Sequence, residues 1–300
     1  MALRTPLVPW TGPAPAGLRL YLKLENLQPI GSFKLRGAGN AIAIADPERR
    51  SRGVSTASAG NMAQGVAFWA ARLGIPCRVV VPDHAPSTKL RAVERLGGTI
   101  ERLPFDAWWQ VLVDHGQPGR DDLFIHPVSD PPVVAGNGTI GLEIVEDLPD
   151  VDAVIVPYGG GGLSCGIASA LRALRPSARV YAAEVETAAP FAAALAAGRP
   201  VPAPYAASFV DGIGARSVLT EMWPLARAIL AGSIVVSLEH VASAIRELAE
   251  RHRVIAEGAG GASVAGALTG KAGSGNVVCI VSGGNIDSEK LSTILEGGTP

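Results

Sequence analysis

Four consecutive glycines, Gly159 to Gly162, are the residues whose pattern most directly indicates binding chemistry. They follow the strand-like run "DAVIVP" and precede the helix-like run "LSCGIASALRAL". Glycines between a strand and a helix let backbone N–H groups converge on an anion, and the helix dipole adds to the attraction. A flexible turn, the alternative, rarely needs four consecutive glycines. The stretch therefore predicts a phosphate site.

The kind of phosphate ligand is narrowed by what the loop lacks. The dinucleotide pattern Gly-x-Gly-x-x-Gly fails in every register, because Leu163, Ser164 or Cys165 stands where a glycine is needed. Glu184, at the end of the next strand, resembles the acid that binds a ribose, so a nicotinamide cofactor stays a minor alternative. No Gly-x-x-x-x-Gly-Lys-Ser/Thr run occurs, which excludes a P-loop ATPase. A small phosphorylated cofactor such as pyridoxal phosphate also requires a lysine, which forms a Schiff base with its aldehyde.

Lys34 is the candidate for that lysine. It is one of five lysines in a chain with 21 arginines, and it lies in "GSFKLRGA". Ser32 is a plausible N-cap of a helix through "LRGAGNAIAIA", which would place Lys34 in the first turn. The helix dipole and partial burial beside Phe33 would then favour the uncharged amine. Spacing alone favours a solvated lysine near a helix start, so the chemical assignment depends on the other motifs.

The elements that must position these residues alternate along the chain. Strand-like runs and helix-like runs follow one another almost throughout, which predicts an α/β fold with parallel sheets covered by helices. The predicted strands are 18–25, 53–58, 77–82, 152–157, 179–185 and 276–284. The predicted helices are 33–45, 61–73, 87–98, 163–174 and 239–254. We expect a surface loop at Gly198 to Ser208 and a break at His126 to Gly138, where the chain would cross between two domains.

The composition limits the classes of protein to which this chain can belong. The chain has 300 residues, of which 48% are hydrophobic and 18% charged, as in a globular protein. The net charge of -1 gives no reason to expect a nucleic-acid or acidic-membrane partner, and no membrane span or signal peptide is visible. Cys77, Cys165 and Cys279 are scattered, which favours buried thiols in a reducing cytoplasm over a redox or metal role.

Eight motifs in this order together identify a family. They are "LKLENLQPIGSFKLRGA", "STASAGNMAQGVAFWAARLG", "VPDHAPSTKLRAVERLGG", "AGNGTIGLEI", "VPYGGGGLSCGIA", "DGIGA", "EGAGGASVAGAL" and "VSGGNID". The set resembles the fold-type II pyridoxal-phosphate enzymes, specifically the threonine/serine dehydratase and serine racemase group, over nearly the whole chain. The resemblance implies a two-domain, tryptophan-synthase-β-like architecture of the catalytic part alone. A small domain, 53–131, would be inserted into a large domain of 1–52 and 132–300, with the cofactor in the cleft between them.

The resemblance also implies residue roles for the cofactor. Lys34 would bind pyridoxal phosphate and then act as the base at the substrate Cα, Phe33 would pack by the ring, and Asn61 would donate to the 3-oxygen. Ser282 would face the pyridine nitrogen; a serine does not force that nitrogen to be protonated, which favours early loss of a β-substituent. The backbone of the glycine loop would bind the phosphate, and two further residues would lie near the cofactor. These residues are Gly159, Gly160, Gly161, Gly162 and Leu163 for the phosphate, and Glu257 and Gly283 near the cofactor.

The segment Ser58, Ala59, Gly60, Asn61 and Met62 is implied to bind the substrate. It lies between a strand and a helix N-terminus, where free N–H groups suit a carboxylate; an ordinary N-cap is the alternative. Serine racemases carry a second serine where this chain has Ala59, and a methyl group cannot move a proton, so dehydration is favoured over racemisation. Met62 replaces a usual histidine, which offers an adaptable apolar wall for a larger substrate such as phenylserine, or is a neutral packing change.

A cation site is a further implication of the resemblance. Some relatives bind a mono- or divalent cation with an acid at a strand end, a backbone carbonyl and a second acid. Glu184 and the carbonyl of Ala188 match, but Pro190 replaces the second acid and has no side-chain oxygen. The cation stays an open alternative at this point.

These expectations combine into one predicted function. The chain would be a pyridoxal-phosphate-dependent dehydratase, or ammonia-lyase, that converts a β-hydroxy amino acid to a 2-oxo acid and ammonia by β-elimination. An amino-acid racemase, a β-replacement synthase and a non-catalytic protein that binds the cofactor or an amino acid are the alternatives. We expect a cytoplasmic homodimer with an amino-acid substrate.

Overall fold

The computed structural model of the chain describes residues 2–85 and 87–300. The chain divides into a first unit, Phe33–Asn137, and a second unit, Leu3–Ser32 with Gly138–Pro300, each with its own hydrophobic core. The chain passes from one unit to the other within α6 (Pro131–Asp147). The predicted small domain, 53–131, lies within the first unit, which also contains the helices that precede it in sequence.

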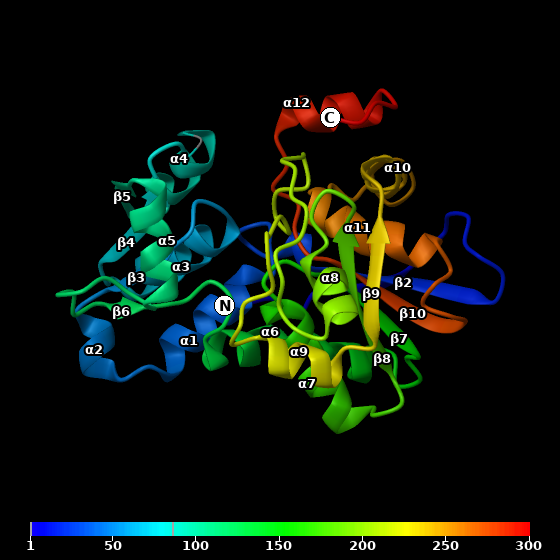
Figure 1. Cartoon of the computed structure of the whole chain (residues 1–300), viewed down its shortest axis with the longest axis horizontal. Coiled ribbons are helices and arrows are strands. Elements are labelled where there is room, and N and C mark those ends of the chain that lie inside the picture. Colours follow the sequence, from blue (N-terminus) through cyan, green and yellow to red (C-terminus); the bar gives the residue numbers. More distant parts are fainter. Residues whose placement is uncertain (1, 86) are drawn as a thin grey trace. The chain divides into compact units, whose positions relative to one another are not determined.

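The first unit is built on a four-stranded parallel sheet in the order β5-β4-β3-β6 (Figure 1). Its strands are β3 (Val54–Ala57), β4 (Cys77–Pro82), β5 (Thr99–Leu103) and β6 (Leu123–Phe124). Its helices are α1 (Lys34–Ile44), α2 (Pro47–Ser51), α3 (Asn61–Leu73), α4 (Ser87–Arg95) and α5 (Phe105–Val113).

Strand β4 shows why the central strands have sequences that are continuously apolar. Its residues alternate between the two faces of the sheet. Val79 and Val81 join the core with Met62 of α3, while Val80 packs with Val111 of α5 on the other face. Helices cover both faces, so no strand position in "VVV" meets water.

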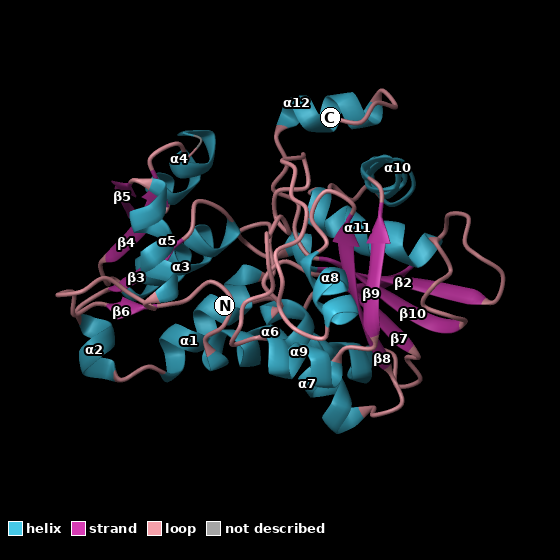
Figure 2. Ribbon diagram, in the orientation of Figure 1, coloured by secondary structure: helices cyan, strands magenta, loops and turns pink. Residues whose placement is uncertain are grey.

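The second unit is built on a six-stranded sheet in the order β1-β2-β10-β7-β8-β9, in which β1 alone is antiparallel to its neighbour (Figure 2). Its strands are β1 (Leu7–Pro9), β2 (Leu18–Leu24), β7 (Ala153–Pro157), β8 (Arg179–Val185), β9 (Gly232–Val236) and β10 (Gly275–Val281). Its helices are η1 (Glu25–Leu27), α7 (Gly162–Leu174), α8 (Pro190–Ala197), α9 (Trp223–Ile229), α10 (Leu238–Glu247), the π-helix η2 (Leu248–His252), α11 (Gly258–Leu268) and α12 (Ser288–Leu295). This mixed α/β architecture with parallel-rich sheets confirms the predicted fold class.

One predicted break is a helix. The stretch His126 to Gly138 is a loop only as far as Asp130, because α6 begins at Pro131. Prolines fit the first turn of a helix, where their missing N–H groups have no intrahelical acceptor. Gly136 lies inside the helix because a Cβ there would be 2.6 Å from the carbonyl oxygen of Arg36, so the glycine permits close packing and does not mark a turn.

No helix among the described residues combines the length and the apolar character that crossing a bilayer requires.

Candidate active site

Lys34 is the first residue of α1, and its position differs in one detail from the prediction. The N-cap residue is Phe33 and not Ser32, so the expected cap position is wrong, and the Phe33 side chain forms no capping hydrogen bond. Ser32 is instead fully buried and forms an isolated β-bridge with Gly283. The Nζ atom of Lys34 donates to the carbonyl oxygen of Pro127 at 2.5 Å and lies 5.1 Å from the centroid of the Phe33 ring.

The loop that contains Pro127 is fixed by His126. The Nδ1 atom of His126 accepts hydrogen bonds from the backbone N–H groups of Val128 and Ser129, at 3.2 and 2.9 Å. The carboxylate of Asp130 accepts the N–H of His126 at 2.7 Å. These bonds close a tight loop after β6 whose Pro127 carbonyl is presented to α1. The sequence reasoning missed this loop because it treated the segment as a plain break.

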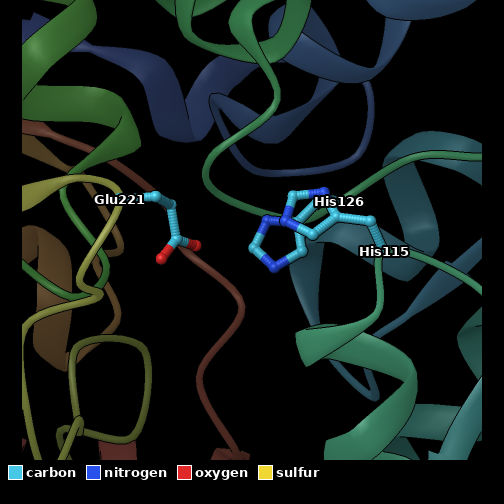
Figure 3. Close-up of side chains that lie close together, drawn as sticks. All are labelled: His115, His126 and Glu221. Atoms are coloured by element: carbon cyan, nitrogen blue, oxygen red, sulfur yellow. The ribbon is translucent and has the colours of Figure 1, made fainter.

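His126 is an uncharged acceptor in this loop. It is 3% exposed, and its ring stacks on that of His115 with a centroid distance of 4.4 Å (Figure 3). Burial lowers the pKa of His126 to about 3, and the positive charges of His115 and Lys34 act in the same direction. The neutral imidazole can therefore accept the loop N–H groups at any ordinary pH.

The predicted substrate loop joins β3 to α3 in the same unit as Lys34. Gly60 is the N-cap residue of α3 and has no side chain to cap the helix, and the N–H of Gly60 donates to the hydroxyl of Ser58 at 3.2 Å. A Cβ built on Gly60 would meet nothing within 4 Å. Further along α3, a Cβ on Gly65 would lie 3.1 Å from the carbonyl oxygen of Lys34, so α1 and α3 pack closely here. The geometry supports a small anionic group at this loop.

Ala59 and Met62 contact the same hydrophobic core but differ in exposure. Met62 is 1% exposed and belongs to the core of the first unit, together with Val66 and Val79. Ala59 is partly buried against the same core. The placement of Met62 supports the packing explanation for the methionine more than that of an apolar wall for a substrate.

The glycine loop of the second unit joins β7 to α7. Gly161 is the N-cap residue of α7 with φ at +97°, a conformation that favours glycine, and as a glycine it has no side chain to cap the helix. A Cβ on Gly161 would also lie 3.1 Å from the hydroxyl oxygen of Tyr158. A Cβ on Gly159 would lie 3.4 Å from the carbonyl oxygen of Gly212 in the "DGIGA" loop. The result is a bare backbone at a helix N-terminus, which fits the phosphate of pyridoxal phosphate.

The cofactor residues predicted at the carboxyl end of β10 lie near that loop in the same unit. Ser282 directly follows β10 and is 1% exposed. The N–H of Glu257 donates to the carbonyl oxygen of Gly283 at 2.9 Å, and a Cβ on Gly283 would lie 2.5 Å from Oε1 of Glu257. The same Oε1 would lie 3.6 Å from a Cβ on Gly212, the neighbour of Gly159. Strand β10 and the glycine loop therefore bring Ser282, Glu257 and the phosphate cradle to one edge of the sheet.

Glu184 ends β8 and is fully buried. Its carboxylate accepts the backbone N–H groups of Phe191 and Ala192, at 2.7 and 2.8 Å, and the hydroxyl of Ser233. Burial raises the pKa of Glu184, while these three hydrogen bonds act in the opposite direction. Such an acid is not available to bind a ribose, which removes the feature that kept a nicotinamide cofactor open.

Lys23 is a second buried lysine, which the sequence reasoning did not single out. It lies in β2 and is fully buried, and its Nζ atom is 2.6 Å from the carboxylate of Glu143 and donates to the carbonyl oxygen of Thr5 at 2.6 Å. These partners give Lys23 a structural role, whereas Lys34 is at a helix N-terminus beside an aromatic ring. The alternation of "LRLYLKL" places Lys23 on the face opposite the leucines, with Arg19 and Tyr21, so the pattern gives no sign that Lys23 is buried.

Comparison with known proteins agrees with this assembly of residues. The family described as "Pyridoxal-phosphate dependent enzyme" matches residues 2–283. The L-threonine ammonia-lyase of Geobacter sulfurreducens is 40% identical over 286 residues, which cover 94% of this chain and 71% of that protein. The L-threonine ammonia-lyase of Thermotoga maritima is 41% identical over 285 residues, with the same two coverages of 94% and 71%. The structure of maize serine racemase superposes with a TM-score of 0.89 and 34% identity, covering 98% of this chain and 92% of that one. The chain therefore belongs to the fold-type II pyridoxal-phosphate-dependent enzymes.

Proposed function

We propose that this enzyme is an ammonia-lyase that converts a β-hydroxy amino acid of the threonine or serine type to a 2-oxo acid and ammonia by β-elimination. The observation that carries the proposal is Lys34, which begins α1 beside Phe33 in a chain that also contains a bare glycine cradle. The identity of about 40% with two L-threonine ammonia-lyases supports the same reaction class.

The residues of the chain have the following roles in the proposed reaction. Pyridoxal phosphate supplies the electron sink for the Cα–H bond pair when it is bound. Lys34 would hold it and take the proton from the substrate Cα, and the backbone of Gly159 to Leu163 would hold its phosphate. Ser282 would be the residue beside its pyridine nitrogen. The loop Ser58–Asn61 binds the substrate carboxylate at the N-terminus of α3.

Ala59 favours elimination over racemisation. A racemase needs a second acid or base on the face of Cα opposite the lysine, and a methyl side chain can neither donate nor accept a proton. Racemisation is nevertheless the second candidate, because the maize serine racemase structure superposes over 98% of the chain. The two activities are separated by their products: a 2-oxo acid with ammonia, or a D-amino acid.

The proposed substrates are small. Met62 lies in the core of the first unit, which leaves no support from that residue for a pocket that accepts a bulky side chain. We therefore place threonine and serine before phenylserine. We also propose a homodimer in a reducing compartment such as the cytoplasm; the free, buried cysteines support the reducing compartment.

The test is a panel of L-threonine, L-serine and phenylserine with the purified enzyme, in which ammonia, 2-oxo acid and D-amino acid are each measured. We expect 2-oxo acid and ammonia in equal amounts from threonine or serine, and no turnover by Lys34→Ala, while Lys271→Ala, at an exposed lysine, retains activity. Adding a thiol should not produce a new amino acid, which a β-replacement synthase would form. D-amino acid as the main product, or normal turnover by Lys34→Ala, would contradict the proposal.

A further inference from the structure

The environment of Glu184 bears on whether this enzyme binds a cation there. The resemblance to cation-binding relatives implied an acid, a backbone carbonyl and a second acid, at Glu184, Ala188 and position 190. These residues fit a cation only if the Glu184 carboxylate has free oxygen lone pairs and the second acid is present. The second acid is absent, because position 190 is a proline. The hydrogen bonds of Glu184 show how its lone pairs are used.

The N-terminus of α8 uses the Glu184 carboxylate as its cap. The N-cap residue, Ala189, has no capping side chain. Pro190 is the first helical residue and has no N–H. The next two N–H groups, of Phe191 and Ala192, donate to the two oxygens of Glu184, and the N–H of Ala193 donates to the carbonyl oxygen of Ala189 at 3.2 Å. Every backbone donor of the first turn thus has an acceptor, and Glu184 supplies two of these bonds.

Ser233 adds a third donor to the same carboxylate. It lies on β9, which is parallel to β8 with Ala182 opposite Ser233 and Glu184 opposite Val235. Residues two apart on a strand share a face, so the Ser233 side chain is on the same side of the sheet as Glu184. Its hydroxyl donates to Oε2 of Glu184.

A cation at this position would have to displace these donors. A carboxylate offers about four lone-pair positions, and three of them receive hydrogens here. Calcium and magnesium take about six or more oxygen ligands, and Pro190 contributes none. The positive end of the α8 dipole also points at the carboxylate, which favours an anion and disfavours a second positive charge.

We propose that Glu184 is the N-terminal cap of α8 and not a cation ligand, so that this enzyme functions with no cation bound at Glu184 and Ala188. The Glu184 carboxylate then binds three hydrogen-bond donors of the protein in place of an ion. This conclusion does not depend on which substrate the enzyme uses.

The Glu184 cap also supports the position of the glycine loop. It fixes the first turn of α8, and Phe191 in that turn stacks on Tyr158 with a centroid distance of 4.7 Å. Tyr158 directly precedes Gly159, and its hydroxyl lies under Gly161. Glu184 therefore positions the glycine loop through Phe191 and Tyr158.

The first experiment measures the melting temperature of the holoenzyme after treatment with EDTA, and again after addition of Mg²⁺, Ca²⁺, K⁺ or Na⁺ as chlorides. We expect the same melting temperature in every condition at constant ionic strength. A ligand that binds only the folded state stabilises it in proportion to the logarithm of its concentration over Kd. A saturable rise with one cation, reversed by EDTA for a divalent ion or by exchange into a salt of the other cation for K⁺ or Na⁺, would overturn the proposal.

The second experiment compares Glu184→Gln and Ser233→Ala with the wild type. Glu184→Gln puts an amide N–H₂ against a backbone N–H, so we expect a lower melting temperature, by the same amount with and without EDTA. Ser233→Ala removes one donor, and a smaller fall is expected, which keeps the test usable if the first variant does not fold. Glu186→Gln is the matched control: Glu186 is exposed, two residues away, and accepts the N–H of Leu238 at 3.0 Å, so little change is expected. A loss in Glu184→Gln that vanishes when the wild type is also stripped with EDTA would show a cation ligand instead.

Discussion

At the scale of single residues, Lys34 and Glu184 each have a hydrogen-bond partner that is distant in sequence. The Nζ atom of Lys34 donates to the carbonyl oxygen of Pro127, and the carboxylate of Glu184 accepts the hydroxyl of Ser233. The composition at a helix N-terminus predicts the glycine loop, but no local sequence pattern predicts a partner that a distant strand or loop supplies.

The buried hydroxyl of Tyr158 leads to a prediction about the free energy of unfolding. Its side chain is fully buried, and its hydroxyl has no hydrogen-bond partner among the described residues. A buried, unpaired polar group is destabilising, so Tyr158→Phe should raise the free energy of unfolding by roughly 1 kcal/mol while it keeps the stack on Phe191. Urea unfolding of the two proteins checks this. Phe191→Leu, which removes the stack, should lower stability; a loss of stability in Tyr158→Phe would show that the hydroxyl is engaged.

His126 predicts a pH dependence of stability. Burial lowers its pKa in the folded state to about 3, from 6.5, so the unfolded chain binds more protons between these values. The stabilisation is complete above pH 6.5 and is lost as pH falls toward 3. Between pH 7 and 5 the loss should be about 2 kcal/mol.

The variant His126→Asn isolates this contribution. An asparagine oxygen can accept the loop N–H groups but does not titrate in this range. Asp130, whose pKa is raised by its burial, acts in the opposite direction and is present in both proteins. Urea unfolding at pH 7 and pH 5 should therefore show a smaller loss in the variant; equal losses would contradict a neutral, buried His126.

At the scale of elements, periodicity and glycine breaks predicted six of the ten strands and five of the twelve α-helices that the structure describes. Helix α3 runs from Asn61 to Leu73 as predicted, because Gly74 ends it in the left-handed conformation, with φ at +63°. Strands β5 and β9 were not predicted, because "TIERL" and "GSIVV" are short and have little contrast with their flanks. Helix α6 begins within the predicted break His126 to Gly138, because the local sequence does not show that its glycines permit close helix packing.

The packing of α6 gives a prediction with a matched pair of variants. A Cβ at Gly136 would lie 2.6 Å from the carbonyl oxygen of Arg36, so Gly136→Ala should lower the free energy of unfolding by about 1–3 kcal/mol through overpacking. Gly266 lies inside α11, where a Cβ would be no closer than 3.4 Å to any neighbour. Gly266→Ala should therefore be neutral or stabilising by up to about 1 kcal/mol, because alanine favours helix. Chemical unfolding of both variants distinguishes the outcomes; equal effects would contradict the packing role of Gly136.

At the scale of the whole molecule, the order of the motifs carried the family and the reaction class, which the comparisons confirm. The two units divide the chain at Phe33 and at Asn137, whereas the predicted small domain spans 53–131. The second boundary lies in the stretch His126 to Gly138, where the sequence predicts that the chain crosses between domains, but it falls inside α6 and not in a loop. The first boundary, between Ser32 and Phe33, has no compositional signal.

The central claim is that Lys34 is the lysine that binds the cofactor, although Lys23 is more deeply buried. The most direct measurement is borohydride reduction of the purified holoenzyme followed by peptide mass spectrometry. We predict that the pyridoxyl group is found on the peptide that contains Lys34 and on no other lysine. A label on Lys23 or another lysine, or a protein that carries no pyridoxal phosphate as purified or after incubation with it, would contradict the account.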